Sequence, residues 1–315
     1  MFTQTRKLFL GCVLLALAGC SGSGSDSDSV SPDPDIPGLP TPVLPSPEPL
    51  AEAEKAAALS TADLVLEVTD PSGKLLSGVS VLDDSGELGV TDDSGRLTLV
   101  DIPTGEKNLR FALAGYAPQV WAADFQTAQT QRVVLIAREA SVSFVAAEGA
   151  DITGKDGAAM VAGANAFVTA AGDIYSGNVL VSVTPVDVAS GETAAGAFPG
   201  SFNAVLEDGS ERPLITYGTV EYHFTDESGN ELQLAEGQTA TIEVPVYVTS
   251  HPDGTPVRLG DVIPFWYLDE DTGIWHEDGE GTVVASEHSP TGLAQRGEVS
   301  HFTWWNVDVS PRPAE

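Results

Sequence analysis

Cysteine is almost absent from this chain: Cys12 and Cys20 are the only two among 315 residues. Both lie near the N-terminus, so no pair remains to form a disulfide in the rest of the chain. Thiol nucleophiles and cysteine-based metal sites are excluded there for the same reason. Stability must therefore come from buried apolar area, which a 42% hydrophobic composition over this length supplies.

Basic residues are also scarce, with 14 Lys and Arg against 46 Asp and Glu, which gives a formal net charge of −32. Nucleic-acid partners are excluded, because binding to phosphates needs clustered Lys and Arg. Anionic lipid head groups would repel this surface, so any membrane attachment must come from a lipid anchor. A strongly acidic surface also keeps a protein soluble.

Catalytic motifs are lacking as well. None of the five histidines is followed by Glu at the H-x-x-E spacing of a metallocarboxypeptidase. No G-x-S-x-G elbow occurs in the part predicted to fold. Residues 149–155 (GADITGK) imitate a phosphate loop, but Asp156 replaces the Ser or Thr that would bind magnesium. We therefore predict that the protein is not an enzyme and uses no cofactor.

The N-terminus carries the most specific pattern. Arg6 and Lys7 precede a short apolar run, residues 8–17, which cannot span a bilayer. Residues 17–20 (LAGC) follow, and the whole resembles a bacterial lipoprotein signal peptide, here residues 1–19. The resemblance implies cleavage before Cys20 and acylation of its thiol. Ser21 after the cysteine implies sorting to the outer membrane, with exposure to the periplasm or the cell surface.

Residues 20–61 are predicted to be an acidic tether rich in Pro and Ser, with eight prolines between Pro32 and Pro49. Such a segment favours extended polyproline II at about 3.1 Å per residue, which would add up to about 55 Å of reach. A short helix is predicted over residues 49–59, before the first folded part.

From residue 62 onward apolar and polar residues alternate, which predicts strands, and turn clusters separate them. We predict an all-β protein: an antiparallel β-sandwich over residues 62–138, a larger antiparallel β-domain over 139–310, and a short tail, 311–315. Around the turn at 269–273 the pattern predicts a hairpin.

Four segments of the first β-part occur in an order that resembles the carboxypeptidase regulatory-like domain. They are 77–81 (SGVSV), 91–97 (TDDSGRL), 102–105 (IPTG) and 114–116 (AGY). The resemblance covers residues 62–138 and implies a small transthyretin-like sandwich.

Four further segments resemble the extracellular β-rich module of the FAM171 and cartilage-intermediate-layer type. They are 263–267 (IPFWY), 272–275 (TGIW), 279–282 (GEGT) and 300–305 (SHFTWW). This resemblance covers about residues 160–310 and implies a role in adhesion or the extracellular matrix, without a reaction.

Two kinds of side chain remain as site candidates. Asp92 and Asp93 share one turn and Asp269 and Asp271 share another, and clustered carboxylates are the ligands that calcium prefers. Plain solvated turns are the alternative. Aromatic residues could instead form a platform on which a sugar stacks, although packing in the core is the competing interpretation. The platform candidates are Trp266, Trp275 and Trp304.

The sequence therefore predicts a lipid-anchored envelope protein that binds or displays without turnover. Its predicted partners are the membrane, through the lipid, and an envelope or extracellular protein or glycan. A carbohydrate-binding lipoprotein is the alternative, and a hydrolase of unknown type is the third possibility.

We expect Cys20→Ala to leave an unprocessed or mislocalised precursor, because the acylated thiol is both the cleavage position and the anchor. Membrane fractionation and the mass of the N-terminal peptide measure this. A variant that is processed and fractionates like the wild type would show that Cys20 is not lipidated.

Overall fold

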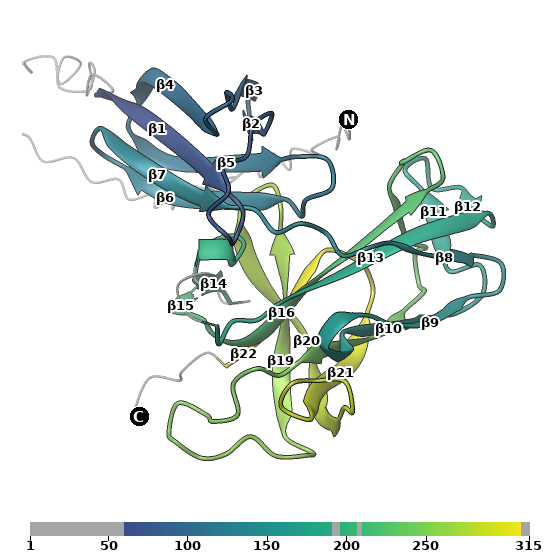
Figure 1. Ribbon diagram of the computed structural model, residues 1–315. Helices are drawn as coiled ribbons and strands as arrows, with labels where there is room; N and C mark the ends of the chain where they lie inside the picture. Colours follow the sequence, from purple (N-terminus) through teal and green to yellow (C-terminus); the bar gives the residue numbers. More distant parts are fainter. Residues whose placement is uncertain (1–59, 191–195, 207–209, 310–315) are drawn as a thin grey trace, which may run out of the picture. The chain divides into compact units, whose positions relative to one another are not determined.

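The first part of the fold consists of seven strands in two facing sheets (Figure 1). A computed structural model describes residues 60–190, 196–206 and 210–309. One sheet has the order β4-β1-β7 and the other the order β3-β2-β5-β6. The strands are β1 (Thr61–Thr69), β2 (Ser80–Asp83), β3 (Gly86–Val90), β4 (Arg96–Pro103), β5 (Gly105–Ala112), β6 (Gln119–Phe125) and β7 (Gln129–Val134).

Alternation places the apolar residues of these strands between the two sheets. Leu64, Leu66 and Val68 of β1 are fully buried, and they pack with Leu109 and Phe111 of β5. The predicted sandwich is confirmed, with one difference: β1 and β7 run parallel. The two strands are the first and last of the sandwich, so the long chain between them allows a parallel pair, whereas a hairpin would not.

One turn recurs in both halves of the chain. Asp92 Oδ1 accepts hydrogen bonds from the backbone N–H of Ser94 at 2.8 Å and of Arg96 at 3.0 Å. Asp70 and Asp226 make the same pair of bonds two and four residues ahead. Gly95 completes the turn with φ +66°, and a Cβ there would lie 2.9 Å from a backbone oxygen. Glycine is therefore required at this position.

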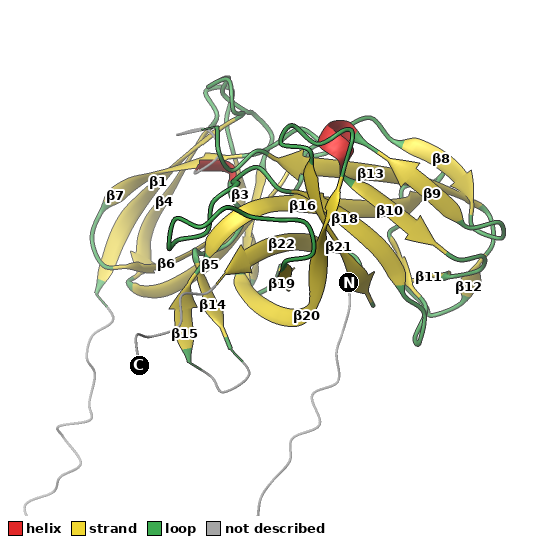
Figure 2. Ribbon diagram, turned by 90° about the horizontal axis from the view of Figure 1, so that it is seen from below, coloured by secondary structure: helices red, strands yellow, loops and turns green. Residues whose placement is uncertain are grey.

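The second part is a long folded sheet with the order β8-β13-β16-β22-β19-β20-β21-β18-β10-β9 (Figures 1 and 2). Its first and last strands, β8 and β9, are consecutive in the sequence, so the sheet curls into a near-barrel. The strands are β8 (Val142–Val145), β9 (Ala150–Thr153), β10 (Ala159–Ala162), β13 (Asn178–Val186), β16 (Ile215–Asp226), β18 (Ala240–Pro245), β19 (Val262–Asp269), β20 (Ile274–Ala285), β21 (Leu293–Val299) and β22 (Trp304–Val309).

Smaller elements complete this part. A separate sheet has the order β12-β11-β17, and β14 joins the large sheet by pairing with β20 and β15. One 3-10 turn, η1 (Lys155–Gly157), follows β9. The predicted hairpin around residues 269–273 is confirmed, because β19 and β20 pair antiparallel. The remaining strands are β11 (Phe167–Thr169), β12 (Ile174–Tyr175), β14 (Asn203–Val205), β15 (Glu211–Pro213) and β17 (Leu232–Leu234).

Several predicted segments lie outside the described residues: the signal peptide with Cys20, the tether up to residue 59 with its short helix, and the tail 311–315. All the residues that the structure describes belong to one compact unit. The predicted boundary between residues 138 and 139 therefore stays a prediction.

Trp305 lies at the centre of the large sheet and is fully buried. We expect Trp305→Ala to lower the free energy of unfolding by about 3–5 kcal/mol, because the lost ring leaves a cavity. Val262→Ala, on the exposed side of β19, is the matched control and should cost less than about 0.5 kcal/mol. Urea unfolding measures both. Equal, small effects would contradict a structural role for Trp305.

Candidate functional site

The three tryptophans that were candidates for a ligand platform are buried, each at most 1% exposed. Their indole N–H groups donate to backbone carbonyls: Trp266 to Asp308 at 3.3 Å, Trp275 to Pro199 at 3.1 Å, and Trp304 to Pro118 at 3.2 Å. A stacking platform needs an exposed ring face, and none of the three offers one. Of the two interpretations of these tryptophans, the structure supports packing in the core and contradicts the platform.

This core, which we call the junction, is defined by Ala117, Phe198, Trp266, Trp275 and Trp304. It packs the chain just before β6 against β19, β20 and β22 of the large sheet. Neighbouring Trp304 and Trp305 point to opposite faces, as adjacent strand residues must. Both are buried because the junction covers one face of β22 and the near-barrel core covers the other.

Hydrogen bonds from Gln119, the first residue of β6, close the junction. Its Nε2 donates to the Phe198 carbonyl at 3.1 Å, and its Oε1 accepts from the Gly200 N–H at 3.2 Å. The side chain is buried, so both ends of the amide are satisfied inside the protein.

A buried ion pair lies beside the junction. Arg138 follows the sandwich, and its guanidinium donates to both carboxylate oxygens of Glu221 on β16, with the shortest contact at 2.6 Å. Glu221 is 3% exposed and Arg138 20%. Burial raises the pKa of Glu221, while Arg138 opposes that rise. Removing one partner of such a pair typically costs about 3–5 kcal/mol, because it leaves a buried charge.

Glu270 adds a second carboxylate to this cluster. The Thr303 hydroxyl donates to its Oε1 at 2.9 Å. Burial raises the pKa of Glu270 to about 7, and Glu221 and Glu231 add repulsion. Such shifts are frequent at functional sites but also arise in structural ion-pair networks. Here Glu221 pairs with Arg138, and Glu270 accepts a hydrogen bond from Thr303 just before β22 begins. Both carboxylates therefore have structural roles.

The four aspartates predicted as calcium candidates have other contacts. Asp92 and Asp269 accept backbone N–H groups of their own turns. Asp93 accepts from the Ser77 hydroxyl at 3.5 Å, and Asp271 pairs with Arg110. Within residues 60–190, 196–206 and 210–309, no group of three or more His, Cys, Asp or Glu is placed to hold a metal ion. The structure gives these aspartates roles in turns and one ion pair.

A Tyr-His-Asp chain of hydrogen bonds was not predicted. The Tyr217 hydroxyl lies 2.7 Å from His251 Nδ1, and His251 Nε2 lies 3.3 Å from Asp261 Oδ2. Tyr217 is fully buried, which raises its pKa to about 12. These hydrogen bonds therefore attach the loop between β18 and β19 to the core. Tyr217 and His251 are 34 residues apart, so no sequence spacing reveals the contact.

A second unpredicted group is the carboxyl of Asp308 on β22, which is fully buried. Its Oδ1 accepts the Ile215 N–H at 2.7 Å, and its Oδ2 accepts from Asn306 Nδ2 at 3.3 Å. Burial raises the pKa of Asp308 to about 8. The alternating pattern of β22 gives no sign of it, since a polar residue at this position reads as solvent-facing.

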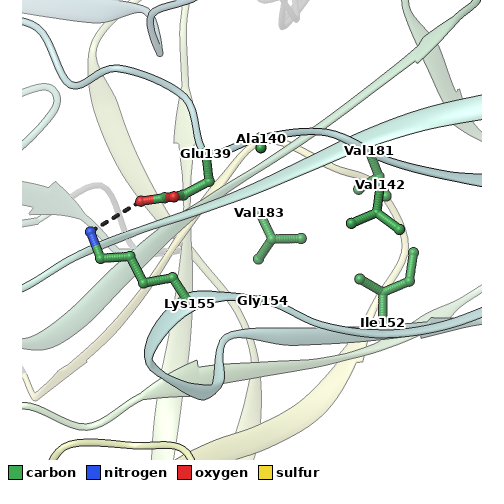
Figure 3. A pocket seen from close by; sticks show the side chains of 8 residues that line it. All are labelled: Glu139, Ala140, Val142, Ile152, Gly154, Lys155, Val181 and Val183. Atoms are coloured by element: carbon green, nitrogen blue, oxygen red, sulfur yellow. Dashed lines mark ion pairs between the residues drawn. The ribbon is translucent and has the colours of Figure 1, made fainter.

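A small hollow of about 130 Å³ opens where β8 and β9 part (Figure 3). Val142, Ile152, Val181 and Val183 form its apolar wall. Glu139 and Lys155 lie at its rim and make an ion pair of 3.0 Å. The ion pair joins the two ends of the near-barrel at this seam.

Among the residues that the structure describes, none forms a helix that could span a lipid bilayer. No protein-family model matches the chain.

Cartilage intermediate layer protein 1 from Sus scrofa is 32% identical over 145 residues, which are 44% of this chain and 22% of that protein. The Homo sapiens protein of the same name is 30% identical over 145 residues, with 44% and 11% covered. The chain thus spans less than a quarter of these relatives.

Solved structures resemble the chain only distantly. The Bacillus anthracis TIE protein has a TM-score of 0.22 at 11% identity, over 80% of this chain and 46% of that chain. BcpA, the major pilin subunit of Bacillus cereus, has a TM-score of 0.21 at 12% identity, over 79% and 95%. The sequence comparison confirms the predicted resemblance to the cartilage-intermediate-layer type as a similarity over part of the chain.

We expect the melting temperature to fall as the pH rises from 6 to 9. The pKa values of Asp308 and Glu270, about 8 and about 7, lie above their ordinary values of 3.8 and 4.5. Protonation of these groups therefore favours the folded state. That contribution is complete below about pH 4 and is lost as the pH rises through 7 and 8.

Asp308→Asn tests this, because the amide keeps an acceptor for the Ile215 N–H and cannot ionise. The variant should show a flatter melting profile between pH 6 and 9 than the wild type. Asp92→Asn is the control and should leave this window unchanged, because the turn hydrogen bonds lower the pKa of Asp92. An unchanged slope in Asp308→Asn would contradict the assignment.

Proposed function

We propose that the chain is a lipid-anchored protein of a bacterial envelope that binds or displays without catalysis. The junction is the observation that carries this proposal. It joins the chain around β6 to the large sheet by a core of tryptophans and by the Arg138–Glu221 pair. An apolar, buried contact of this kind opposes relative motion, whereas enzymes that close over a substrate depend on such motion.

The composition of the buried site supports the same function. The large aromatic rings pack in cores, and the perturbed carboxylates Glu221 and Glu270 engage Arg138 and Thr303. With Trp266, Trp275 and Trp304 buried, the carbohydrate-binding alternative loses the residues that suggested it. A protein of the envelope or the cell exterior is therefore the partner that we favour.

Sequence features complete the proposal. The lipoprotein-like segment ending at Cys20 would attach the chain to the outer membrane, and the tether would hold the β-structure away from it. The resemblance of residues 62–138 to the carboxypeptidase regulatory-like domain supports a non-catalytic module. The partial similarity to cartilage intermediate layer protein 1 supports an extracellular type of β-structure.

Surface display on whole cells tests the proposal. Replacing residues 30–49 by an unrelated Pro-rich segment of equal length should preserve display and partner binding, because only extension matters. Deleting the same residues should reduce both, while the amount of protein in the membrane fraction stays the same. Antibody access to intact cells and cross-linking to neighbouring envelope proteins measure these outcomes. A deletion variant that is displayed and cross-links like the wild type would contradict the role of the tether.

A further inference from the structure

A groove of about 400 Å³ lies between the outer face of β5 and β6 and the strands β14, β15 and β20. Figure 2 shows β14 and β15 beside β5 and β6. Its wall combines three carboxylates and small polar groups with apolar side chains. Its lining includes Glu106, Ala122, Ala123, Asp124 and Glu211.

The groove carries negative charge at a costly position. Glu106 and Asp124 are directly opposite in the register of β5 and β6, so their side chains share one face. Like charges that face each other across two strands destabilise the pair. Glu211 on β15 lines the same groove. Arg110 is on the same face, but its guanidinium already pairs with Asp271.

The edge of β6 borders this groove. β6 is the last strand of its sheet. At Val120 the backbone groups of β6 point away from β5. The Val120 carbonyl accepts a hydrogen bond from the Gly200 N–H at 3.1 Å, and the Val120 N–H donates to Gln119 Oε1 at 3.0 Å. In an antiparallel ladder this orientation recurs at every second residue. Ala122 and Asp124 therefore present their N–H and carbonyl groups outward.

The edge is open beyond Val120. Within the described part of the chain, no backbone group pairs with the outward groups of Ala122 and Asp124. Ala122, Ala123 and Asp124 all line the groove although their side chains alternate between faces. The backbone edge itself therefore forms part of the wall, and Gly200 marks where an added strand would continue.

We propose that this groove binds an extended, cationic segment of a partner protein, which adds as a strand to β6. Its backbone would pair with Ala122 and Asp124, and alternate Lys or Arg side chains would meet Glu106, Asp124 and Glu211. Strand addition supplies affinity through the main chain, and the facing side chains supply specificity. The inference rests on the proposed binding function and names the class of partner.

The test uses the full chain and a labelled peptide, acetyl-(Lys-Thr)4-amide, titrated by fluorescence anisotropy at 0.15 M salt. The triple variant Glu106→Gln, Asp124→Asn, Glu211→Gln should bind at least ten-fold more weakly. The matched control, Asp84→Asn, Glu87→Gln, Glu148→Gln, removes the same charge from exposed positions that do not line the groove. It should bind within two-fold of the wild type.

A second peptide separates strand pairing from charge attraction. Replacing two central threonines by proline keeps every lysine but removes two backbone donors, and binding should weaken at least ten-fold. Equal binding of the two peptides would overturn strand addition. Equal loss in both triple variants would reduce the effect to the overall charge. A groove variant that aggregates without any loss of binding would mean that the acids protect the edge, which also overturns the proposal.

The proposed function is read out separately. The groove variant should keep its surface display on whole cells, because the tether and the junction are unchanged. Loss of peptide binding with normal display supports the groove. Normal peptide binding in a chain that is not displayed would contradict the envelope function and leave the groove intact.

Discussion

Burial of β22 on both faces is the constraint on which the rest of the structure depends. Trp305 and Val307 face the core of the near-barrel, while Trp304 faces the junction. A strand in this position cannot leave either face to water, so two separate layers must cover it. One layer is the opposite wall of the large sheet, and the other is the segment around Ala117 and Phe198. Folding of the sheet and formation of the junction are therefore coupled through one strand.

The polar groups of this region follow from the same burial. An indole N–H without an acceptor is costly in a dry core, and backbone carbonyls of Pro118, Pro199 and Asp308 accept those of Trp304, Trp275 and Trp266. The Arg138–Glu221 ion pair connects the residue that follows the sandwich to β16 of the large sheet. Because each of these bonds has a fixed geometry, together they select one packing of the aromatic rings.

Period-two alternation was enough to predict the strands and the sandwich, and the turn at residues 269–273 was enough to predict the β19–β20 hairpin. Alternation could not tell which faces are covered. It separates Trp304 from Trp305, but only the sheet order shows that both faces of β22 are inside. The ligand platform was wrong for that reason: exposed and buried aromatic stripes have the same spacing.

Polar contacts were hidden from the sequence for a different reason. Arg138 and Glu221 are 83 residues apart, and Tyr217 and His251 are 34 apart. Such pairs meet only because the strand order brings their elements together. The parallel pairing of β1 with β7 has the same origin. By contrast, turn contacts such as those of Asp92 span four residues at most, and their sequence motif identified them as turns.

Three sets of acidic residues differ in what surrounds their carboxyl groups. In the turns, hydrogen bonds from the side chains of Ser72, Ser94 and Asn230, together with backbone N–H groups, lower the pKa values of the carboxyls they contact, which are those of Asp70, Asp92 and Asp226. In the interior, burial raises the pKa of Asp308 and Glu270, so protons replace part of the missing solvation. Glu106 and Asp124 belong to neither group: they face each other across two strands, beside an unpaired edge. Their facing carboxylates repel each other, and a cationic side chain between them would relieve this repulsion. A free ion would meet only the carboxylates. An extended cationic peptide would meet the carboxylates and also pair with the open backbone edge of β6, so it is the partner that fits both features.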